Sequence, residues 1–138
     1  MANEFRAVID TSVAVSSVLR PRSVPRQAFD LAAERGQLLV SAATIAELDE
    51  VLRRPKFNKY VTEEERLEFL AALVRDAEIV RITTEITECR DPKDNKFLEL
   101  AVSGTASHII SGDADLLTLH PFQGIAIVTP HVFLQNTA

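Results

Sequence analysis

Residues 91–101 read DPKDNKFLELA, and residues 108–117 read HIISGDADLL. In the first stretch Asp91 precedes a proline, a pattern typical of an N-cap followed by the first helical position, and it predicts a helix that runs to Gly104. The second stretch is an apolar run that ends at Asp113, as a buried strand ends in a polar turn. Both place acidic side chains at turns, where unpaired negative charge does not help folding. These acids are therefore candidates for function.

Further strands and helices are predicted on either side of these two stretches. Apolar runs that predict strands cover residues 5–10, 38–40, 79–82 and 125–128. Helical patterns cover residues 13–19, 23–36, 41–52 and 62–74, with a short apolar segment at 116–119 and a terminal turn at 132–134. Strands that alternate with helices through short connections predict a mainly parallel sheet covered on both faces.

Length and composition are typical of one soluble domain that spans residues 1–138. With 138 residues, 46% of them hydrophobic, the chain can build one core but not two. The single cysteine, Cys89, forms neither an internal disulfide nor a cysteine zinc site. No apolar run approaches the roughly 20 residues of a membrane span, and the first residues lack a signal-peptide pattern. We therefore expect a cytoplasmic protein that does not enter a membrane.

The net charge of −5 excludes a protein that coats nucleic acid through its overall field, because that mode needs many basic residues. Local contacts to phosphate remain open. Solvated surface charge is the ordinary interpretation of small basic clusters. Two such clusters are present, Arg53, Arg54, Lys56 and Lys59 in one, and Arg90, Lys93 and Lys96 in the other.

Four acids are predicted to converge at one edge of the sheet. In open parallel sheets, ligands bind outside the carboxyl ends of the strands. Asp10 and Asp113 each follow a strand end, while Glu47 and Asp94 lie on helices that can face the same edge. For Glu47 a second interpretation is equally open, because Thr44 and Glu47 have the spacing of a capping box, in which the glutamate only binds a backbone N–H.

Converging carboxylates indicate a divalent metal ion. At an effective dielectric constant near 20, two unit charges about 4 Å apart repel by roughly 4 kcal/mol, and a hard cation removes this cost. Carboxylate ligands suit Mg²⁺ or Mn²⁺, whereas the scattered His108, His120 and His131 do not have zinc-site spacing. Such an ion can activate water and neutralise a phosphodiester under attack. The predicted chemistry is hydrolysis of a nucleic-acid backbone.

The order of these motifs along the chain is more specific than any one of them. The chain resembles the PIN-domain ribonucleases, in particular the VapC-like toxin components of bacterial toxin–antitoxin pairs. The matching segments are residues 8–12 (VIDTS), Ser41 with Glu47-Leu48, residues 89–98 (CRDPKDNKFL), residues 110–117 (ISGDADLL) and residues 125–133 (IAIVTPHVF).

The resemblance implies a fold and an activity. The fold is a three-layer α/β/α domain with a five-stranded, mainly parallel sheet, and the activity is a Mg²⁺- or Mn²⁺-dependent endoribonuclease. RNA is then the substrate, a cognate antitoxin the protein partner, and a homodimer the expected assembly. Matched position by position, the family's four acids fall on Asp10, Glu47, Asp94 and Asp113, and we expect Asp10, Asp94 and Asp113 to bind the metal.

Several neighbouring residues are expected to assist. Ser111 occupies the place of a family hydroxyl that positions a metal-bound water or a phosphate, and Asp115 is an outer contributor. Asp91 lies three residues before Asp94, and either could reach the metal. Ser12 stands where the family usually has asparagine; its single hydroxyl could weaken activity or alter substrate orientation. The residues expected to contact RNA phosphates are Arg90, Lys93 and Lys96.

Two other functions are compatible with parts of the sequence. One is a catalytically weak PIN fold that binds RNA or protein, which the serine at position 12 makes conceivable. The other is a receiver-like signalling domain, which also clusters acids around Mg²⁺ on a doubly wound sheet. A receiver needs a lysine after its last strand and an aspartate after its third, and residues 127–130 and 79–83 contain neither.

Overall fold

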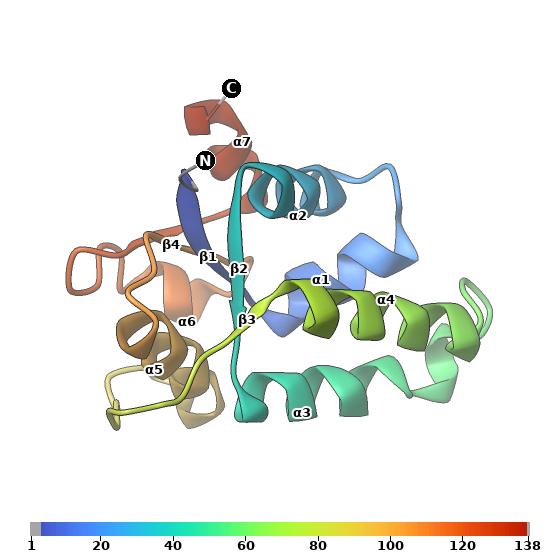
Figure 1. Ribbon diagram of the computed structural model, residues 1–138, viewed down its shortest axis with the longest axis horizontal. Helices are drawn as coiled ribbons and strands as arrows, with labels where there is room; N and C mark the ends of the chain where they lie inside the picture. Colours follow the sequence, from blue (N-terminus) through green and yellow to red (C-terminus); the bar gives the residue numbers. More distant parts are fainter. Residues whose placement is uncertain (1–3, 138) are drawn as a thin grey trace.

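Five parallel strands form one sheet in the computed structural model, which describes residues 4–137 (Figure 1). The strand order is β3-β2-β1-β4-β5. The strands are β1 (Phe5–Ile9), β2 (Gly36–Val40), β3 (Glu78–Ile79), β4 (His108–Ile110) and β5 (Ala126–Val128). The predicted five-stranded parallel sheet is confirmed.

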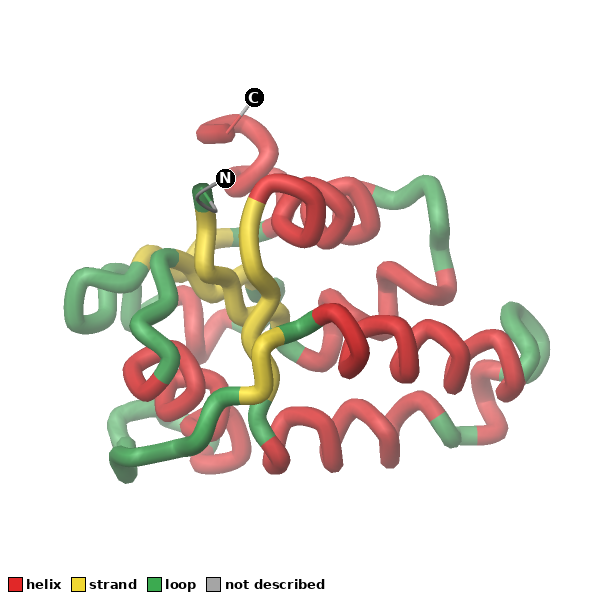
Figure 2. Tube along the Cα trace, in the orientation of Figure 1, coloured by secondary structure: helices red, strands yellow, loops and turns green. Residues whose placement is uncertain are grey.

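Helices cover both faces of this sheet and extend beyond its edge (Figure 2). The α-helices are α1 (Thr11–Leu19), α2 (Val24–Arg35), α3 (Ala42–Leu52), α4 (Glu63–Asp76), α5 (Asn95–Ser103), α6 (Ala114–Leu117) and α7 (Pro130–Thr137), and the 3₁₀ helices are η1 (Pro55–Phe57) and η2 (Pro92–Asp94). This arrangement confirms the predicted α/β/α class. The predicted domain bounds, 1–138, include residues 1–3 and 138, which lie outside the described residues. No helix within residues 4–137 is long and apolar enough to cross a bilayer.

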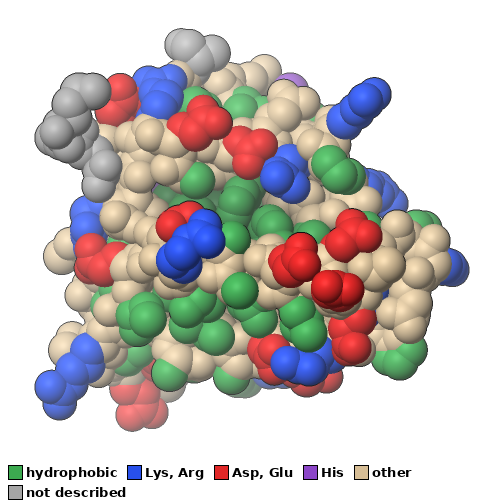
Figure 3. Space-filling model, turned by 45° about the vertical axis from the view of Figure 1, so that its right-hand side comes forward, with side chains coloured by type: hydrophobic (Ala, Val, Ile, Leu, Met, Phe, Trp, Pro, Cys, Tyr) green, Lys and Arg blue, Asp and Glu red, His purple; other side chains and the backbone are tan. Residues whose placement is uncertain are grey.

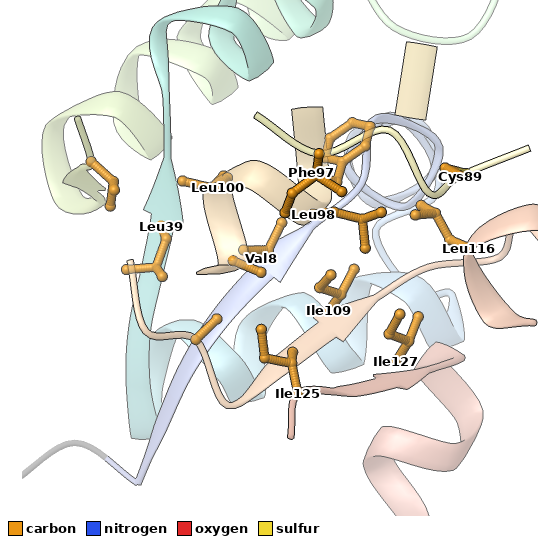
Figure 4. Packing of buried hydrophobic residues seen from close by; sticks show 14 residues of the cluster. Val8, Leu39, Cys89, Phe97, Leu98, Leu100, Ile109, Leu116, Ile125 and Ile127 are labelled. Carbon is orange, nitrogen blue, oxygen red and sulfur yellow. The ribbon is translucent and has the colours of Figure 1, made fainter. Parts of the chain in front are cut away.

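The period-two pattern of β1 divides the core between the two faces. Phe5 and Ala7 face α2 and α7, where they pack with Phe29 and Phe133. Val8 faces the other way, onto a cluster that α5 and α6 cover (Figure 4). The residues of that second cluster include Leu39, Phe97, Leu98, Leu100, Ile109, Leu116 and Ile127. Helix α5, which begins directly after Asp94, is therefore anchored on the sheet.

A third apolar cluster joins α1, α3 and α4. Val15 and Val18 of α1 pack with Leu48 and Leu52 of α3 and with Leu70 of α4. In Figure 1, α3 and α4 run side by side and are joined at their far end by the loop that contains η1. This cluster places α3 along α1, so that both helices border the carboxyl edge of the sheet.

The strand order creates a switch point between β1 and β4. From β1 the chain builds outward through β2 and β3, and it then returns to place β4 on the other side of β1. Ile9 and Ile110 are register partners, so the residues that follow them, Asp10 and Ser111, are neighbours. Receiver domains have strand order 2-1-3-4-5, which differs from this one. The receiver-like alternative is therefore excluded.

Two predicted features differ from the structure. The strand expected at 79–82 is only the two-residue β3, because this edge pairs only with Leu39 and Val40, and Ile79 stays 62% exposed. Gly36 closes α2 as its C-cap, as predicted, and it also begins β2 in extended conformation; a Cβ there would lie 2.6 Å from the Phe5 carbonyl oxygen. The terminal turn expected at 132–134 is part of α7, whose Phe133 is buried.

A buried arginine organises the connection between α3 and α4. Arg66, on α4, is 1% exposed. Its guanidinium donates to the carbonyl oxygens of Leu52 at 2.6 Å and of Val61, and to Asn58 Oδ1 at 3.0 Å. The two carbonyl groups belong to the end of α3 and to the following loop and have no partners within a helix, and Asn58 is a side chain of the same loop. Arg66 therefore holds the loop in one conformation.

Replacing Arg66 with methionine should destabilise the protein. The variant keeps a long side chain but leaves several carbonyl groups without donors, so the free energy of unfolding should fall by about 2–4 kcal/mol. Urea unfolding followed by circular dichroism measures this change. The control is Arg75→Met, which alters an exposed arginine of the same helix and should leave stability essentially unchanged. Equal stability of Arg66→Met and the wild type would contradict the role given to Arg66.

Candidate active site

Asp10 occupies the switch point and is rigidly held. It follows β1, its backbone N–H donates to the Ile110 carbonyl oxygen at 3.1 Å, and it caps α1. Asp10 Oδ1 accepts from the Val13 N–H at 2.9 Å and from the Ser12 hydroxyl at 3.0 Å. Asp10 Oδ2 accepts from the Ser111 hydroxyl. With Asp10 only 3% exposed, these bonds fix the orientation of its carboxylate.

Ser111 connects Asp10 to Asp113. Its hydroxyl oxygen also accepts from the Asp113 N–H at 2.9 Å, so one side chain contacts both acids. Asp113 caps the short α6, and its Oδ1 accepts from the Asp115 N–H at 2.7 Å. Two strand ends, β1 and β4, thus meet through a single buried serine. Asp115 contributes its backbone N–H to this arrangement, and its side chain is half-buried beside it.

Asp94 faces the same place from η2, and one of its oxygens lacks a partner. Asp94 Oδ2 is buried and, within residues 4–137, accepts no hydrogen bond. Asp91, the competing candidate, is the N-cap of η2 and accepts from the Lys93 N–H at 3.1 Å. The capping role expected for Asp91 is confirmed. Asp94, in contrast, is left free to bind a ligand.

The surroundings raise the pKa of both Asp94 and Asp10. Burial is the main cause for Asp94, and the charges of Asp113, Asp91 and Glu47 add to it, which brings its pKa to about 7. A proton on Asp94 can be shared with Asp113, which favours the neutral form further. Burial also raises the pKa of Asp10, against the opposing effect of hydrogen bonds from Ser111, Val13 and Ser12. Keeping the carboxylates of Asp94 and Asp10 ionised therefore costs free energy.

Glu47 does not cap its helix. The N-cap of α3 is Ser41, and the capping box is formed by Ser41 with Thr44, so the capping interpretation of Glu47 is wrong. Glu47 instead accepts from the Thr11 hydroxyl with one oxygen and pairs with the Lys96 ammonium through the other. This contact joins α1, α3 and α5 above the sheet edge. Lys96, expected to contact RNA phosphate, is thus paired with an acid.

The acids line one end of an open cleft with a volume of about 470 Å³. Its lining comprises Asp10, Thr11, Ser12, Val15, Ser16, Leu19, Glu47, Val51, Arg54, Lys56, Phe57, Asp94, Phe97 and Asp113. All four predicted catalytic acids are included, whereas Asp91, Arg90 and Lys93 are not. Thr11 belongs to the segment VIDTS, but no pattern in the sequence predicts its contact with Glu47. The basic end contains Arg54 and Lys56 of the cluster at 53–59, for which the sequence predicts only solvated surface charge.

The acids fit a divalent cation that keeps most of its water. Among the described residues, no group of three or more carboxylate, histidine or cysteine side chains is close enough together to hold a metal ion by itself. Mg²⁺ is commonly bound by only one or two carboxylates together with waters and substrate phosphates, so it needs no such group. The free Asp94 Oδ2, beside Asp113 and Asp10, supplies oxygen donors of the required kind. The Cys89 thiol, with a pKa raised by burial, supplies no competing soft ligand.

Comparison with known proteins places the chain in a family. A model of the PIN domain matches residues 6–115, which include all four acids. Uncharacterized protein MJ1680 of Methanocaldococcus jannaschii is 34% identical over 118 residues, which cover 84% of this chain and 76% of that protein.

Solved structures agree in fold. PAE2754 from Pyrobaculum aerophilum has a TM-score of 0.63 and 14% identity, over 94% of this chain and 88% of that one. VapC20 of Mycobacterium tuberculosis, a sarcin-ricin loop cleaving toxin, has a TM-score of 0.54 and 11% identity, over 87% of this chain and 98% of that one. The family match and the 34% identical relative together show that this chain belongs to the PIN-domain family.

Proposed function

We propose that this protein is a metal-dependent endoribonuclease that hydrolyses RNA phosphodiester bonds. The observation that carries the proposal is the buried, unpartnered Asp94 Oδ2, which shares a cleft with Asp10 and Asp113. A buried polar atom without a partner costs roughly 1–3 kcal/mol, more when it is charged. Such a cost is expected where a ligand completes the site.

The acids of the cleft differ in how firmly they are held before a metal ion binds. Asp10 has both oxygens hydrogen-bonded, so it can hold a ligand without rearranging. Asp94 and Asp113 gain most from a bound cation, because it removes their mutual repulsion. Mg²⁺ or Mn²⁺ held by Asp94 together with Asp10 or Asp113, and by the third of these acids through water, would supply activated water and neutralise charge on the phosphate. Ser111 keeps Asp10 and Asp113 in position for that ion.

The Thr11, Glu47 and Lys96 contact supports substrate binding at the same place. Lys96 is only partly exposed, with 22% of its side chain accessible, and its ammonium is paired with Glu47, which lines the cleft. A lysine ammonium has three donors, so it can bind Glu47 and a phosphate oxygen together. We propose that Glu47 orients Lys96 and adjusts the charge of the cleft. Arg90 and Lys93, both exposed, are proposed as outer phosphate contacts.

The biological role we propose is that of a toxin held inactive by a cognate antitoxin in the cytoplasm. Support comes from the family membership and from the fold shared with VapC20, which is a toxin. A homodimer is part of the same proposal. In the proposed metal site, Asp115 and Ser12 have only supporting roles. Ser12 acts through its hydrogen bond to Asp10.

Two observations favour a second candidate function, a PIN fold that binds RNA or protein with little turnover. Lys96 pairs with Glu47, and no group of three or more acids, histidines or cysteines among residues 4–137 could hold a metal ion by itself. In that case RNA would bind normally, and cleavage would be slow even at saturating metal.

Cleavage of a mixed single-stranded RNA pool tests the main proposal. We expect Mg²⁺ or Mn²⁺ to support cleavage and EDTA to abolish it. Asp94→Asn should lower the rate by roughly 100-fold or more, because it removes a charged metal ligand. Asp91→Asn is the matched control, since it changes the same charge on the same turn and asparagine can still cap. Equal losses in both variants, or full activity of Asp94→Asn, would contradict the assignment.

Metal-free stability should depend on pH through Asp94. The folded pKa of Asp94 is about 7, above the ordinary value of 3.8, so the unfolded chain releases this proton first as pH rises. The wild type therefore loses stability between about pH 4 and pH 7, and Asp94→Asn is spared that loss.

Thermal unfolding in EDTA measures the effect. Asp94→Asn should have nearly the wild-type Tm at pH 4 and a higher Tm at pH 8, with Mg²⁺ reducing the difference. A Tm difference that stays constant between pH 4 and pH 8 would be inconsistent with the raised pKa.

A further inference from the structure

We propose that the loop between α3 and α4, residues 53–61, binds the single-stranded RNA that leads away from the acids. The inference rests on the proposed function, because it names how the same cleft would hold its substrate. Lys56 and Lys59 would contact phosphates, and Tyr60 would stack on a base. Arg66 would act as the positioning residue beneath the loop.

The cleft itself leads from the acids to this loop. One wall is formed by α1 and the other by α3, and the far end is lined by Arg54, Lys56 and Phe57. Glu47 and Arg54 are seven residues apart along α3 and its end, which corresponds to about 10 Å of helix. A strand with one phosphate at the acids and an extended backbone would therefore pass the loop. Polar Ser12 and Ser16 line the path between the two ends.

Two lysines of the loop are free to bind anions. Arg53 pairs with Asp49 at 3.0 Å, and Arg54 pairs with Glu50 at 2.9 Å, so those two arginines are already balanced. Neither Lys56 nor Lys59 forms an ion pair with any residue in the described range 4–137. Both are exposed, and Lys56 lines the cleft. Lys56 and Lys59 are therefore the unpaired cations of the loop, although the first turn of α4, which follows it, carries the acids Glu63, Glu64 and Glu65.

Each of these lysines is next to an aromatic ring. The Lys56 ammonium lies 5.2 Å from the Phe57 ring centroid, and the Lys59 ammonium lies 5.2 Å from the Tyr60 ring centroid. Tyr60 is 65% exposed, the most exposed of the large apolar side chains in the described residues. An aromatic face beside a cation is the combination that binds single-stranded nucleic acid, because the ring stacks on a base while the cation meets the backbone.

The loop is ordered before any ligand binds. Arg66 donates to the carbonyl oxygens at both ends of the loop and to Asn58 in its middle. Backbone bonds from Asn58 to Pro55 and from Tyr60 to Phe57 close the turn. A preformed loop reduces the entropy lost on binding. The backbone that carries Lys56, Lys59 and Tyr60 is thus held in one conformation, which favours a binding site over a merely solvated charge cluster.

RNA fits this loop better than an acidic protein segment. The chain carries a net charge of −5, and acidic and basic side chains are interspersed on the face that Figure 3 presents. A metal ion at Asp10, Asp94 and Asp113 could bridge to the carboxylates of an acidic peptide as well as to phosphates. The choice of RNA therefore rests on the exposed ring of Tyr60, on which a base can stack and for which an acidic peptide has no counterpart.

The test is binding of a fluorescein-labelled single-stranded RNA to the Asp94→Asn protein in Mg²⁺, followed by anisotropy at several salt concentrations. The Lys56→Ala, Lys59→Ala double variant should lower the slope of log affinity against log salt by about 0.7 for each lysine. Tyr60→Ala should weaken binding roughly 5- to 150-fold with an unchanged slope. Tyr60→Phe, which keeps the ring, should restore binding.

Arg81→Ala is the matched control. Arg81 is exposed and follows β3, in a segment that runs away from the loop between α3 and α4 in Figure 1. An unchanged slope in the double variant, or an equal change in Arg81→Ala, would overturn the proposal. The same variants are also tested for binding of a labelled acidic peptide. If the double variant weakens binding of the peptide and leaves RNA binding unchanged, the proposal is overturned and the loop is a protein-binding site. Wild-type protein that binds RNA through the loop but never cleaves it would refute the nuclease activity alone.

Discussion

Like-charge repulsion at the carboxyl edge of the sheet is the constraint on which the rest of this structure depends. Asp10, Asp94 and Asp113 line one cleft, and burial together with the neighbouring charges raises the pKa of Asp94 to about 7. The fold tolerates this charge because hydroxyl and backbone N–H groups hold Asp10, and because Ser111 links it to Asp113. One oxygen of Asp94 is left without a partner among residues 4–137, which is why we propose that a ligand completes the arrangement.

The topology explains why these groups meet and why the cleft has two different ends. The switch between β1 and β4 brings two strand ends together, which supplies the acidic end. The packing of α1 against α3 extends the cleft away from the sheet, and the loop after α3 supplies the basic end. Arg66 fixes that loop from the core side. A metal ion and a polyanion are the pair of ligands that suits both ends.

Local sequence patterns predict the position of a site residue when that position depends on a single strand or helix. Asp10 and Asp113 could be placed because an apolar run that stops at an aspartate marks a strand end, and parallel strands align their ends. Glu47 could not be assigned, because its spacing from Thr44 fits a cap equally well. Its true partners, Thr11 and Lys96, come from distant parts of the chain. The burial of Arg66 also depends on tertiary packing, since nothing in its own helix distinguishes it from exposed arginines.

The most direct test of the account is a crystal of the wild-type protein grown or soaked with Mn²⁺, examined by anomalous diffraction. The account predicts an anomalous peak in the cleft, roughly 2–2.3 Å from Asp94 Oδ2, with a second ligand from Asp10 or Asp113. A cleft without such a peak at saturating Mn²⁺, with Asp94 Oδ2 still unpartnered, would contradict the claim that these acids form a metal site.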